Sequence, residues 1–407
     1  MSRKIYVRQL SATGSLLLSS PLYISIFLMR FSFGLVLFTL PLYLPKKEFS
    51  YLVVGLIAAA YPAAETACGP AIGILADRFG RNKWIWMGLS ISTVSLFAFT
   101  LSTNVAYLVL VHSIQGVAAA MIVVASLTMV TDTSTRFTRG RDMGIYDFAN
   151  LGGYMIGIFV AGVLARIHFL LAPFYLGSAL AGVAAVYAYI MMEESNGTKD
   201  TNALSPIETI CILISDRRAA AMFPIWLSVT TFIGMALTFG PRLGPSPMIT
   251  SSVIAGVVMV LAFSQPFFGH LSDHYGRGRL MMLGMLSLIG FFATVIAMFR
   301  LRIDTLHLMP FFAIFGVGSF AFAPAALASL GDIAPKHGRG TTMGVYSVVI
   351  SLGTIIGPLL GGYLLDRYGL ASLFYTGLLI LISALALAIL IAGPDFVELG
   401  SLHNSRK

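Results

Sequence analysis

The chain has 407 residues, of which 57% are hydrophobic and only 11% are charged, and its mean hydropathy is +0.87. A soluble domain needs roughly a quarter of its residues charged to cover its surface, so this composition excludes an ordinary globular protein. A net charge of +9 would indicate nucleic-acid binding if the basic residues formed one surface patch. Basic residues in short loops between apolar spans instead set the orientation of a membrane protein. We therefore expect a lipid bilayer, and no nucleic acid, as the partner of this chain.

The N-terminal segment is basic and is followed by an apolar stretch longer than the roughly 7 to 15 residues of a signal-peptide core, so a retained first helix is expected. Cys68 lies in an apolar run and Cys211 in the polar centre of the chain. Their spacing indicates neither a disulfide framework nor a metal site.

Apolar segments long enough to cross a bilayer, which takes about 20 residues per helix, follow one another along the chain. Continuous apolar runs of this length argue against a β-barrel. We predict an all-α membrane protein with 12 transmembrane helices, at residues 21–43, 52–74, 84–102, 105–130, 143–166, 170–192, 219–240, 249–271, 280–299, 307–330, 342–365 and 370–393.

Lys and Arg set the orientation of these helices. With both termini in the cytoplasm, most of the 26 Lys and Arg residues fall in the inner segments, as the positive-inside rule requires. We expect a multi-pass protein of the cell membrane with cytoplasmic termini. A polar segment, residues 193–218, separates an N-terminal bundle (1–192) from a C-terminal bundle with a short tail (219–407).

Two segments of the first bundle recur in the second. GILADRFGR at residues 73–81 returns as GHLSDHYGR at residues 269–277, and RGRDMGIYDFANLGGYMIG at residues 139–157 returns as RGTTMGVYSVVISLGTIIG at residues 339–357. These matches include Asp, Arg and Gly at fixed loop positions, which chance similarity between apolar helices does not produce. The chain therefore reads as two homologous six-helix halves, as in transporters with parallel repeats.

Through these motifs the chain resembles the major facilitator superfamily over essentially its whole length. The loop GILADRFGRNK is similar to the most specific signature of that family, and GHLSDHYGRGR to its second-half echo. In the fourth span, LVLVHSIQGVAAA has His112 where the family pattern has Arg. The glycine pattern of the drug–proton antiporters is complete in the eleventh span, whereas the fifth-span copy has Ile158 in place of its proline.

The resemblance implies a cytoplasmic gate at the two copies of the loop. In the family arrangement Asp77 faces the start of the eleventh span near Thr341, and Asp273 faces the start of the fifth near Arg141. Backbone N–H groups at a helix N-terminus stabilise such a carboxylate. Asp77→Asn is therefore expected to lower transport without affecting folding. The alternative is that these charges only anchor loops.

Ion pairs between Arg81 and Asp132, and between Arg277 and Asp332, complete the gate that the resemblance implies. Such contacts hold the halves together while the cytoplasmic side is closed and break when it opens. The expected gating residues are Gly73, Asp77, Arg78, Gly80, Arg81, Asp132, Gly269, Asp273, Gly276, Arg277 and Asp332.

Small residues allow helices to approach closely where no hydrophobic force drives association. A proline inside a helix bends it, because it lacks an N–H group and its ring clashes with the preceding turn. Packing and bending, more than a specific antiport role, account for Gly353, Gly357, Pro358, Gly361 and Gly362 in the eleventh span.

Charges inside the spans are more informative, because each costs several kcal/mol unless it is paired or hydrated. Arg30 and Glu65 each lie about ten residues from the cytoplasmic end of adjacent antiparallel spans, which places both roughly 15 Å deep. We expect them to pair or to face one aqueous cavity. In the functional interpretation Glu65 carries a proton coupled to substrate binding and Arg30 stabilises its ionised form. The alternative is a structural ion pair.

Further polar side chains recur at helical spacing in the spans. Each has an ordinary structural explanation, since Ser and Thr bond their own helix and a lone His is usually structural. Together they predict a mildly polar cavity whose ionisable groups lie in the first half. The remaining candidates for substrate binding or proton coupling are Tyr61, His112, Gln115, Asp147, Asn150 and Trp226.

The function expected from these features is secondary active transport of small organic solutes by alternating access, as proton-coupled efflux of lipophilic or cationic compounds. The alternative is proton-coupled uptake of a sugar or an organic anion, with Arg30 binding the carboxylate. No phosphate-binding GxxxxGK[ST] loop is present in the sequence, so ATP is not expected to drive transport. We expect a monomer, no enzymatic activity, no cofactor and no metal, with a small-molecule substrate and protons as partners.

Overall fold

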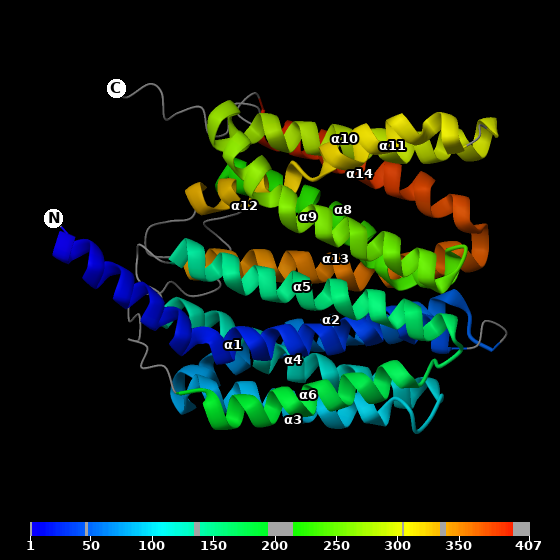
Figure 1. Cartoon of the computed structure of the whole chain (residues 1–407). Coiled ribbons are helices and arrows are strands. Elements are labelled where there is room, and N and C mark those ends of the chain that lie inside the picture. The colour runs from blue at the N-terminus through cyan, green and yellow to red at the C-terminus, as the bar shows by residue number, and fades with distance from the viewer. Residues whose placement is uncertain are drawn as a thin grey trace, which may run out of the picture. The chain divides into compact units, whose positions relative to one another are not determined.

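The protein is described here by a computed structural model, shown in Figure 1. It describes residues 2–44, 48–133, 139–193, 215–302, 305–333 and 339–393, without the side chains of residues 2–20 and of a few others. Every regular element in these ranges is an α-helix. The expected linker, 193–218, lies almost wholly outside the described residues, as does Cys211.

The first half of the chain forms six helices. Ser50 caps the second of them through its hydroxyl, which accepts a hydrogen bond from the Val53 N–H at 3.3 Å, as N-cap serines commonly do. The helices are α1 (Ser2–Tyr43), α2 (Tyr51–Phe79), α3 (Arg81–Ala98), α4 (Val105–Thr133), α5 (Arg139–Arg166) and α6 (Ala172–Met191).

The second half forms six spans from seven helices, because the tenth predicted span is broken. Pro324 lies in the first turn of the helix after the break, where its missing N–H costs nothing, and Gly316 and Gly318 weaken the helix before it. The helices are α8 (Arg217–Leu243), α9 (Pro247–Tyr275), α10 (Arg277–Leu301), α11 (Thr305–Ser319), α12 (Phe322–Ile333), α13 (Arg339–Tyr368) and α14 (Leu370–Ala392).

Eleven of the spans in the described residues are long and apolar enough to cross a membrane. The remaining predicted span, helix α3, is less apolar than these eleven, because its first turn contains Arg81 and Lys83. The first candidate span, Pro21–Tyr43, has the predicted bounds, although helix α1 begins at Ser2. The all-α membrane architecture is therefore confirmed, and the orientation of the termini stays a prediction.

The chain divides into two compact units. One unit comprises Met1–Lys199 with Leu237–Met259, and the other comprises Asp200–Ala236 with Val260–Lys407. In the first unit α1 packs against α5 and α6, α4 packs against α2 and α3, and α3 packs against α6. Figure 1 shows α1 and α5 side by side. In the second unit α10 packs against α11, α12 and α14.

Glycines allow α1 and α5 to approach closely. A Cβ atom at Gly153 would lie 2.8 Å from the Arg30 Cβ, and one at Gly157 would meet the Phe31 carbonyl oxygen and lie 2.9 Å from the Gly34 Cα. Contact distances this short leave room only for hydrogen. These glycines therefore fix the distance between the two helices.

The same packing recurs 200 residues later between α8 and α13. A Cβ atom at Gly353 would meet the Thr230 side chain, and one at Gly357 would meet the Thr231 carbonyl oxygen. Pro358 packs on Gly234, where a Cβ would lie 3.0 Å from its Cδ. The internal repeat is thus a repeat of helix packing. Gly361 and Gly362 are buried in the same helix, and the bend expected at Pro358 stays a prediction.

The two signature loops share an unusual backbone conformation. Gly80, between α2 and α3, has φ 91°, and Gly276, between α9 and α10, has φ 94°. Residues with a Cβ rarely adopt this conformation, so both loops require glycine here. The other two loop glycines differ, because a Cβ at Gly73 would touch only Val124, at 3.7 Å, and one at Gly269 would have no neighbour within 4 Å.

Candidate functional site

Arg30 lies at the centre of a cluster formed by α1, α2 and α5. Its Nη1 donates a hydrogen bond of 2.7 Å to the hydroxyl of Tyr154, and its guanidinium lies 5.0 Å from the centre of that ring. Arg30 is 8% exposed. The cation is therefore covered by Tyr154 from α5, an arrangement that combines a charged hydrogen bond with a cation–π contact.

Glu65, on α2, is the acidic member of this cluster and is only partly buried. It interacts electrostatically with Arg30. Among the described side chains, however, no ion pair or hydrogen bond joins Glu65 to any residue. The direct pair expected from equal depth is not formed, and the guanidinium donates to Tyr154 instead. The two charges therefore share one region without a direct contact.

Tyr61 lies one turn before Glu65 and is 6% exposed. Its ring stacks at 4.4 Å on Phe33 and at 5.5 Å on His112. Its hydroxyl interacts electrostatically with Arg30 and Glu65, although in the described residues it has no well-aligned hydrogen-bond partner. Tyr61 is thus both an aromatic wall and a polar neighbour of the two charges.

Sequence reasoning missed Tyr146, which belongs to the same cluster. It is 3% exposed, its hydroxyl lies 3.0 Å from the Ser126 hydroxyl, and it interacts electrostatically with Arg30 and Glu65. The sequence could have indicated this residue, because Tyr146 lies about two helical turns before Tyr154 on α5 and therefore shares a face with it.

His112 and Gln115, on α4, lie beside Tyr61. The Nδ1 of His112 lies 2.7 Å from the Ile57 carbonyl oxygen, so the ring donates there, and Phe99 packs edge-on against it. A buried histidine bonded to backbone in this way has the ordinary structural role, holding α4 to α2. His112 therefore does not replace the missing family arginine as a charged group in this arrangement.

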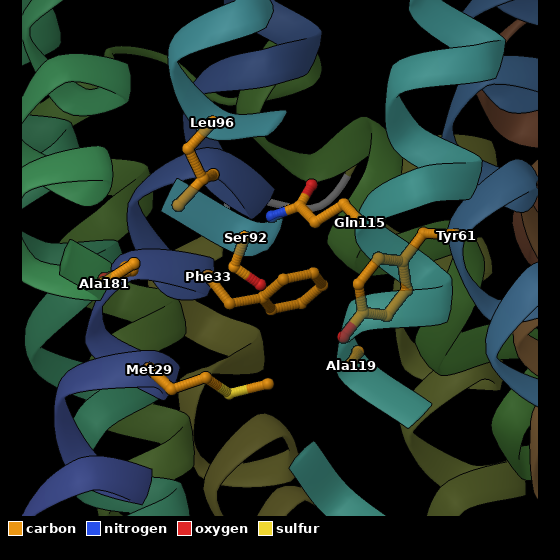
Figure 2. A pocket seen from close by; sticks show the side chains of 9 residues that line it. Met29, Phe33, Tyr61, Ser92, Leu96, Gln115, Ala119 and Ala181 are labelled. Carbon is orange, nitrogen blue, oxygen red and sulfur yellow. The ribbon is translucent and has the colours of Figure 1, made fainter. Parts of the chain in front are cut away.

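Gln115 lines a cavity of ≈ 10 Å³ between α1, α2, α3, α4 and α6, a volume that suits about one water molecule and no organic substrate. Figure 2 shows the Gln115 amide pointing towards Ser92, with the Phe33 ring between Ser92 and Tyr61. The Gln115 Oε1 is buried with no hydrogen-bond partner among the described residues.

The polar residues expected on α5 and α8 have contrasting surroundings. The Asp147 side chain is exposed, whereas the Asn150 Oδ1 is buried and has no partner among the described residues. Trp226 is 7% exposed and packs at 5.1 Å against Phe322 in the apolar core of the second unit. Asp147 is thus accessible, and Trp226 is a core residue.

At the signature loop of the first half, Arg81 and Asp132 form the expected ion pair. The Arg81 Nε lies 2.7 Å from the Asp132 Oδ2, and both side chains are largely buried. Arg78 is exposed and stacks on Phe79 at 5.5 Å. The Asp77 side chain lies outside the described residues.

In the second-half loop, an Arg277 Nη2 lies 3.4 Å from the Asp273 Oδ1. The side chains of Asp332, Thr341 and Arg141 lie outside the described residues, so the expected Arg277–Asp332 pair and the carboxylate contacts stay predictions. In the part of the chain that the structure describes, no group of three or more His, Cys, Asp or Glu side chains is placed to hold a metal ion.

The profile of the Major Facilitator Superfamily matches residues 22–241 and 219–401. The chain belongs to the Major Facilitator Superfamily. It is 28% identical to "Multidrug resistance protein 2" of Bacillus subtilis over 361 residues, which cover 84% of this chain and 87% of that protein. It is 23% identical to "Quinolone resistance protein NorA" of Staphylococcus aureus over 393 residues, which cover 95% and 97%.

Solved structures of this superfamily have the same fold. A bacterial homologue of the human lysosomal transporter Spinster, in an inward-facing and unoccupied conformation, matches with a TM-score of 0.76 and 16% identity, over 94% of this chain and 97% of that one. The nucleoside transporter NupG matches with a TM-score of 0.70 and 17% identity, over 92% and 98%. Together with the family match and the curated relatives, this makes the chain a multi-pass membrane transporter of small molecules.

Proposed function

We propose that the protein exports lipophilic, cationic compounds across the cell membrane in exchange for protons, acting as a monomer with both termini in the cytoplasm. The observation that carries this proposal is the contrast between Glu65 and Arg30. Glu65 is partly buried and accepts no hydrogen bond from a described residue, whereas the guanidinium of Arg30 is buried and donates to Tyr154. A cation entering this region therefore meets a carboxylate that no hydrogen bond from a described residue occupies.

Aromatic rings beside the carboxylate support the lipophilic character of the substrate. The ring of Tyr61 stacks on Phe33 at 4.4 Å, and Tyr154 lies edge-on to Phe33 at 5.5 Å. Aromatic faces attract organic cations and offer apolar area without a specific shape. Such a surface favours flat, hydrophobic, positively charged compounds over sugars.

Coupling to protons follows from competition at Glu65. A proton and a cationic substrate each neutralise the same carboxylate, so binding of one weakens binding of the other, and this linkage is reciprocal. An inward proton gradient then loads protons from the outer side and releases the substrate there. Arg30, which interacts electrostatically with Glu65, sets the balance between the two.

Alternating access in this proposal uses residues 1–192 and 219–407 as the moving halves, joined by residues 193–218. The Arg81–Asp132 pair and the glycines at φ 91° and 94° support a gating role for the two signature loops. The names of the two drug-resistance relatives support efflux. Transport without an enzymatic step is part of the same proposal.

Inside-out membrane vesicles containing the protein test this function directly. We expect an imposed proton gradient to drive uptake of a fluorescent cation such as ethidium into these vesicles, and Glu65→Gln to abolish the gradient-dependent part. Glu193→Gln is the matched control, because it neutralises an exposed carboxylate that follows α6. Unchanged proton dependence in Glu65→Gln would reject the assigned role of Glu65.

Uptake of a sugar or an organic anion is the second candidate. It needs Arg30 to reach the substrate carboxylate, but Arg30 is 8% exposed and already bonded to Tyr154. The likeness to NupG concerns the fold only. In right-side-out vesicles, proton-driven accumulation of such a solute, with no export of ethidium, would favour this candidate over the proposed one.

A further inference from the structure

Arg242 is a buried cation far from the cluster around Glu65. It lies in the last turn of α8, and it is 3% exposed. An arginine near the end of a span normally extends its charged group to the interface and so keeps it hydrated. Arg242 does not do so, and its position therefore depends on what the protein offers its guanidinium.

Two groups from the first half of the chain hold this guanidinium. Its Nη2 donates a hydrogen bond of 2.7 Å to the carbonyl oxygen of Leu44, the residue that follows α1, and it lies 5.4 Å from the ring centre of Tyr51, the first residue of α2. Tyr51 also packs edge-on against Phe239 of α8, at 6.0 Å. Arg242 thus fastens the end of α8 to the connection between α1 and α2.

The chemistry of this contact suits a cation. The last carbonyl oxygens of a helix lack backbone partners and carry the negative end of the helix dipole, and the face of a tyrosine ring attracts a guanidinium. The planar, permanently charged group of arginine can serve both at once, which lysine cannot. A hydrogen bond to a charged group is stronger than one between neutral groups.

The internal repeat does not account for Arg242. In the register that superposes the glycine contacts of α1–α5 on those of α8–α13, Pro41-Leu42-Tyr43 corresponds to Pro241-Arg242-Leu243. Leu42 therefore occupies the equivalent position in the first half. Residues 237–259 also cluster with residues 1–199, so the end of α8 belongs to the same compact unit as the first six helices.

We propose that Arg242 is the outer latch of the transporter. It ties the first helix of the second half to the first two helices of the first half at the end of the membrane where α1 terminates, which is the outer side in the proposed orientation. This inference rests on the proposed transport by alternating access. Opening of the outer side separates the halves there, so the Arg242 contacts break in the outward-open state and stabilise the outward-closed one.

The consequence is a population shift. A group that stabilises one of two states biases the equilibrium by the difference in its interaction energy between them. Removing the guanidinium therefore favours the outward-open state, and the inner side closes correspondingly. A merely structural arginine would loosen the α1–α2 connection locally, without any change at the inner side.

Two cysteine reporters distinguish a latch from a merely structural arginine. Both are introduced into a chain in which Cys68 and Cys211 have been replaced by serine. Leu44→Cys reports on the outer side, because Leu44 is 0% exposed and contributes only its backbone to the bond. Gly144→Cys reports near the inner end of α5, where an added side chain has no neighbour within 4 Å. A membrane-impermeant maleimide labels the first in right-side-out vesicles and the second in inside-out vesicles.

With Arg242→Leu we expect labelling of the Leu44→Cys reporter to become about tenfold faster and labelling of the Gly144→Cys reporter to become slower. Arg242→Lys, which keeps the charge but not the planar group, should be intermediate, and it preserves the test if Arg242→Leu does not fold. Arg300→Leu is the matched control, because Arg300 makes a similar contact, 2.7 Å to the Tyr375 hydroxyl, within the second half.

Unchanged labelling at both reporters would overturn the latch, and so would faster labelling at Leu44→Cys alone. The assay needs neither a substrate nor a proton gradient. If the protein does not export ethidium but the two reporters change in opposite directions, drug export is rejected and the latch is retained. If the protein exports ethidium but labelling is unchanged, only the latch is rejected.

Discussion

The α1–α5 pair of the first half and the α8–α13 pair of the second are built on the same contacts. A Cβ atom added at Gly157 would meet the Phe31 carbonyl oxygen in the first pair, and one added at Gly357 would meet the Thr231 carbonyl oxygen in the second. Both residues of the second contact lie 200 positions after those of the first. The two loops before α3 and α10 likewise share a glycine with positive φ. Backbone geometry and helix spacing are therefore common to both halves.

The ionisable side chains inside the spans differ between the two halves. Thr230 stands where the first half has Arg30, and its hydroxyl bonds the Trp226 carbonyl oxygen of its own helix at 2.8 Å. Leu261 stands in place of Glu65. Helix packing is thus common to both halves, whereas the ionisable groups inside the spans are concentrated in the first, and the second half is its apolar counterpart.

The largest effect is expected when a charged residue of the first half is replaced by its uncharged equivalent from the second half. Arg30→Thr removes the charge that interacts with Glu65 and the donor that Tyr154 accepts from. Both the contact of Tyr154 and the charge balance at Glu65 then change, and we expect proton-driven ethidium transport to fall by at least about tenfold. Vesicle uptake checks this result.

Arg300→Thr is the control for that variant, since Arg300 donates to a tyrosine hydroxyl at the same distance of 2.7 Å but lies exposed. It should transport normally. Equal losses in both variants would contradict a special role for the first-half cluster.

Equality of packing is tested by Gly157→Ala and Gly357→Ala. The added methyl group meets a backbone carbonyl oxygen of the facing helix in either case, and overpacking of this kind costs about 1–3 kcal/mol. We expect both variants to lose similar stability, measured by unfolding in detergent. Gly144→Ala, which has open space around it, should remain at wild-type stability, and a large difference between the two pairs would show that the halves are packed differently.

A smaller effect is expected at the signature loops. Gly80→Ala and Gly276→Ala place a Cβ at φ 91° and 94°, at a cost of roughly 1–2 kcal/mol. Gly73→Ala and Gly269→Ala meet no such strain and have open surroundings. Thermal unfolding should separate the first two variants from the second two. Indistinguishable unfolding temperatures would remove the requirement for glycine in these loops.

Features that depend on local chemistry could be predicted from the sequence. Apolar length gives the spans, because a bilayer admits few alternatives. Recurrence of GILADRFGR as GHLSDHYGR predicts two homologous halves, although the compact units have different bounds, since residues 237–259 cluster with the first six helices. The Arg81–Asp132 ion pair was also predicted, from the family resemblance, and is confirmed. The break between α11 and α12 was not predicted, because hydropathy gives one continuous span there, although Gly316, Gly318 and Pro324 mark the break in the sequence.

Contacts between helices distant in sequence could not be predicted in the same way. Depth along a helix placed Arg30 level with Glu65, but depth does not say which face of α1 meets α5. Tyr154 and Tyr146 reach this region only because Gly153 and Gly157 allow α5 to pack closely on α1. The contacts of Arg242 likewise depend on where α8 ends relative to α1, which no motif encodes.

Proton release upon substrate binding tests the central claim, that a proton and a cationic substrate compete for Glu65, most directly. The purified protein is mixed with ethidium in a weakly buffered solution, at a pH where Glu65 is protonated, and the change in pH is recorded with a dye. We predict about one proton released per bound substrate by the wild type and none by Glu65→Gln. Substrate binding without proton release by the wild type, or equal release by both proteins, would contradict the account.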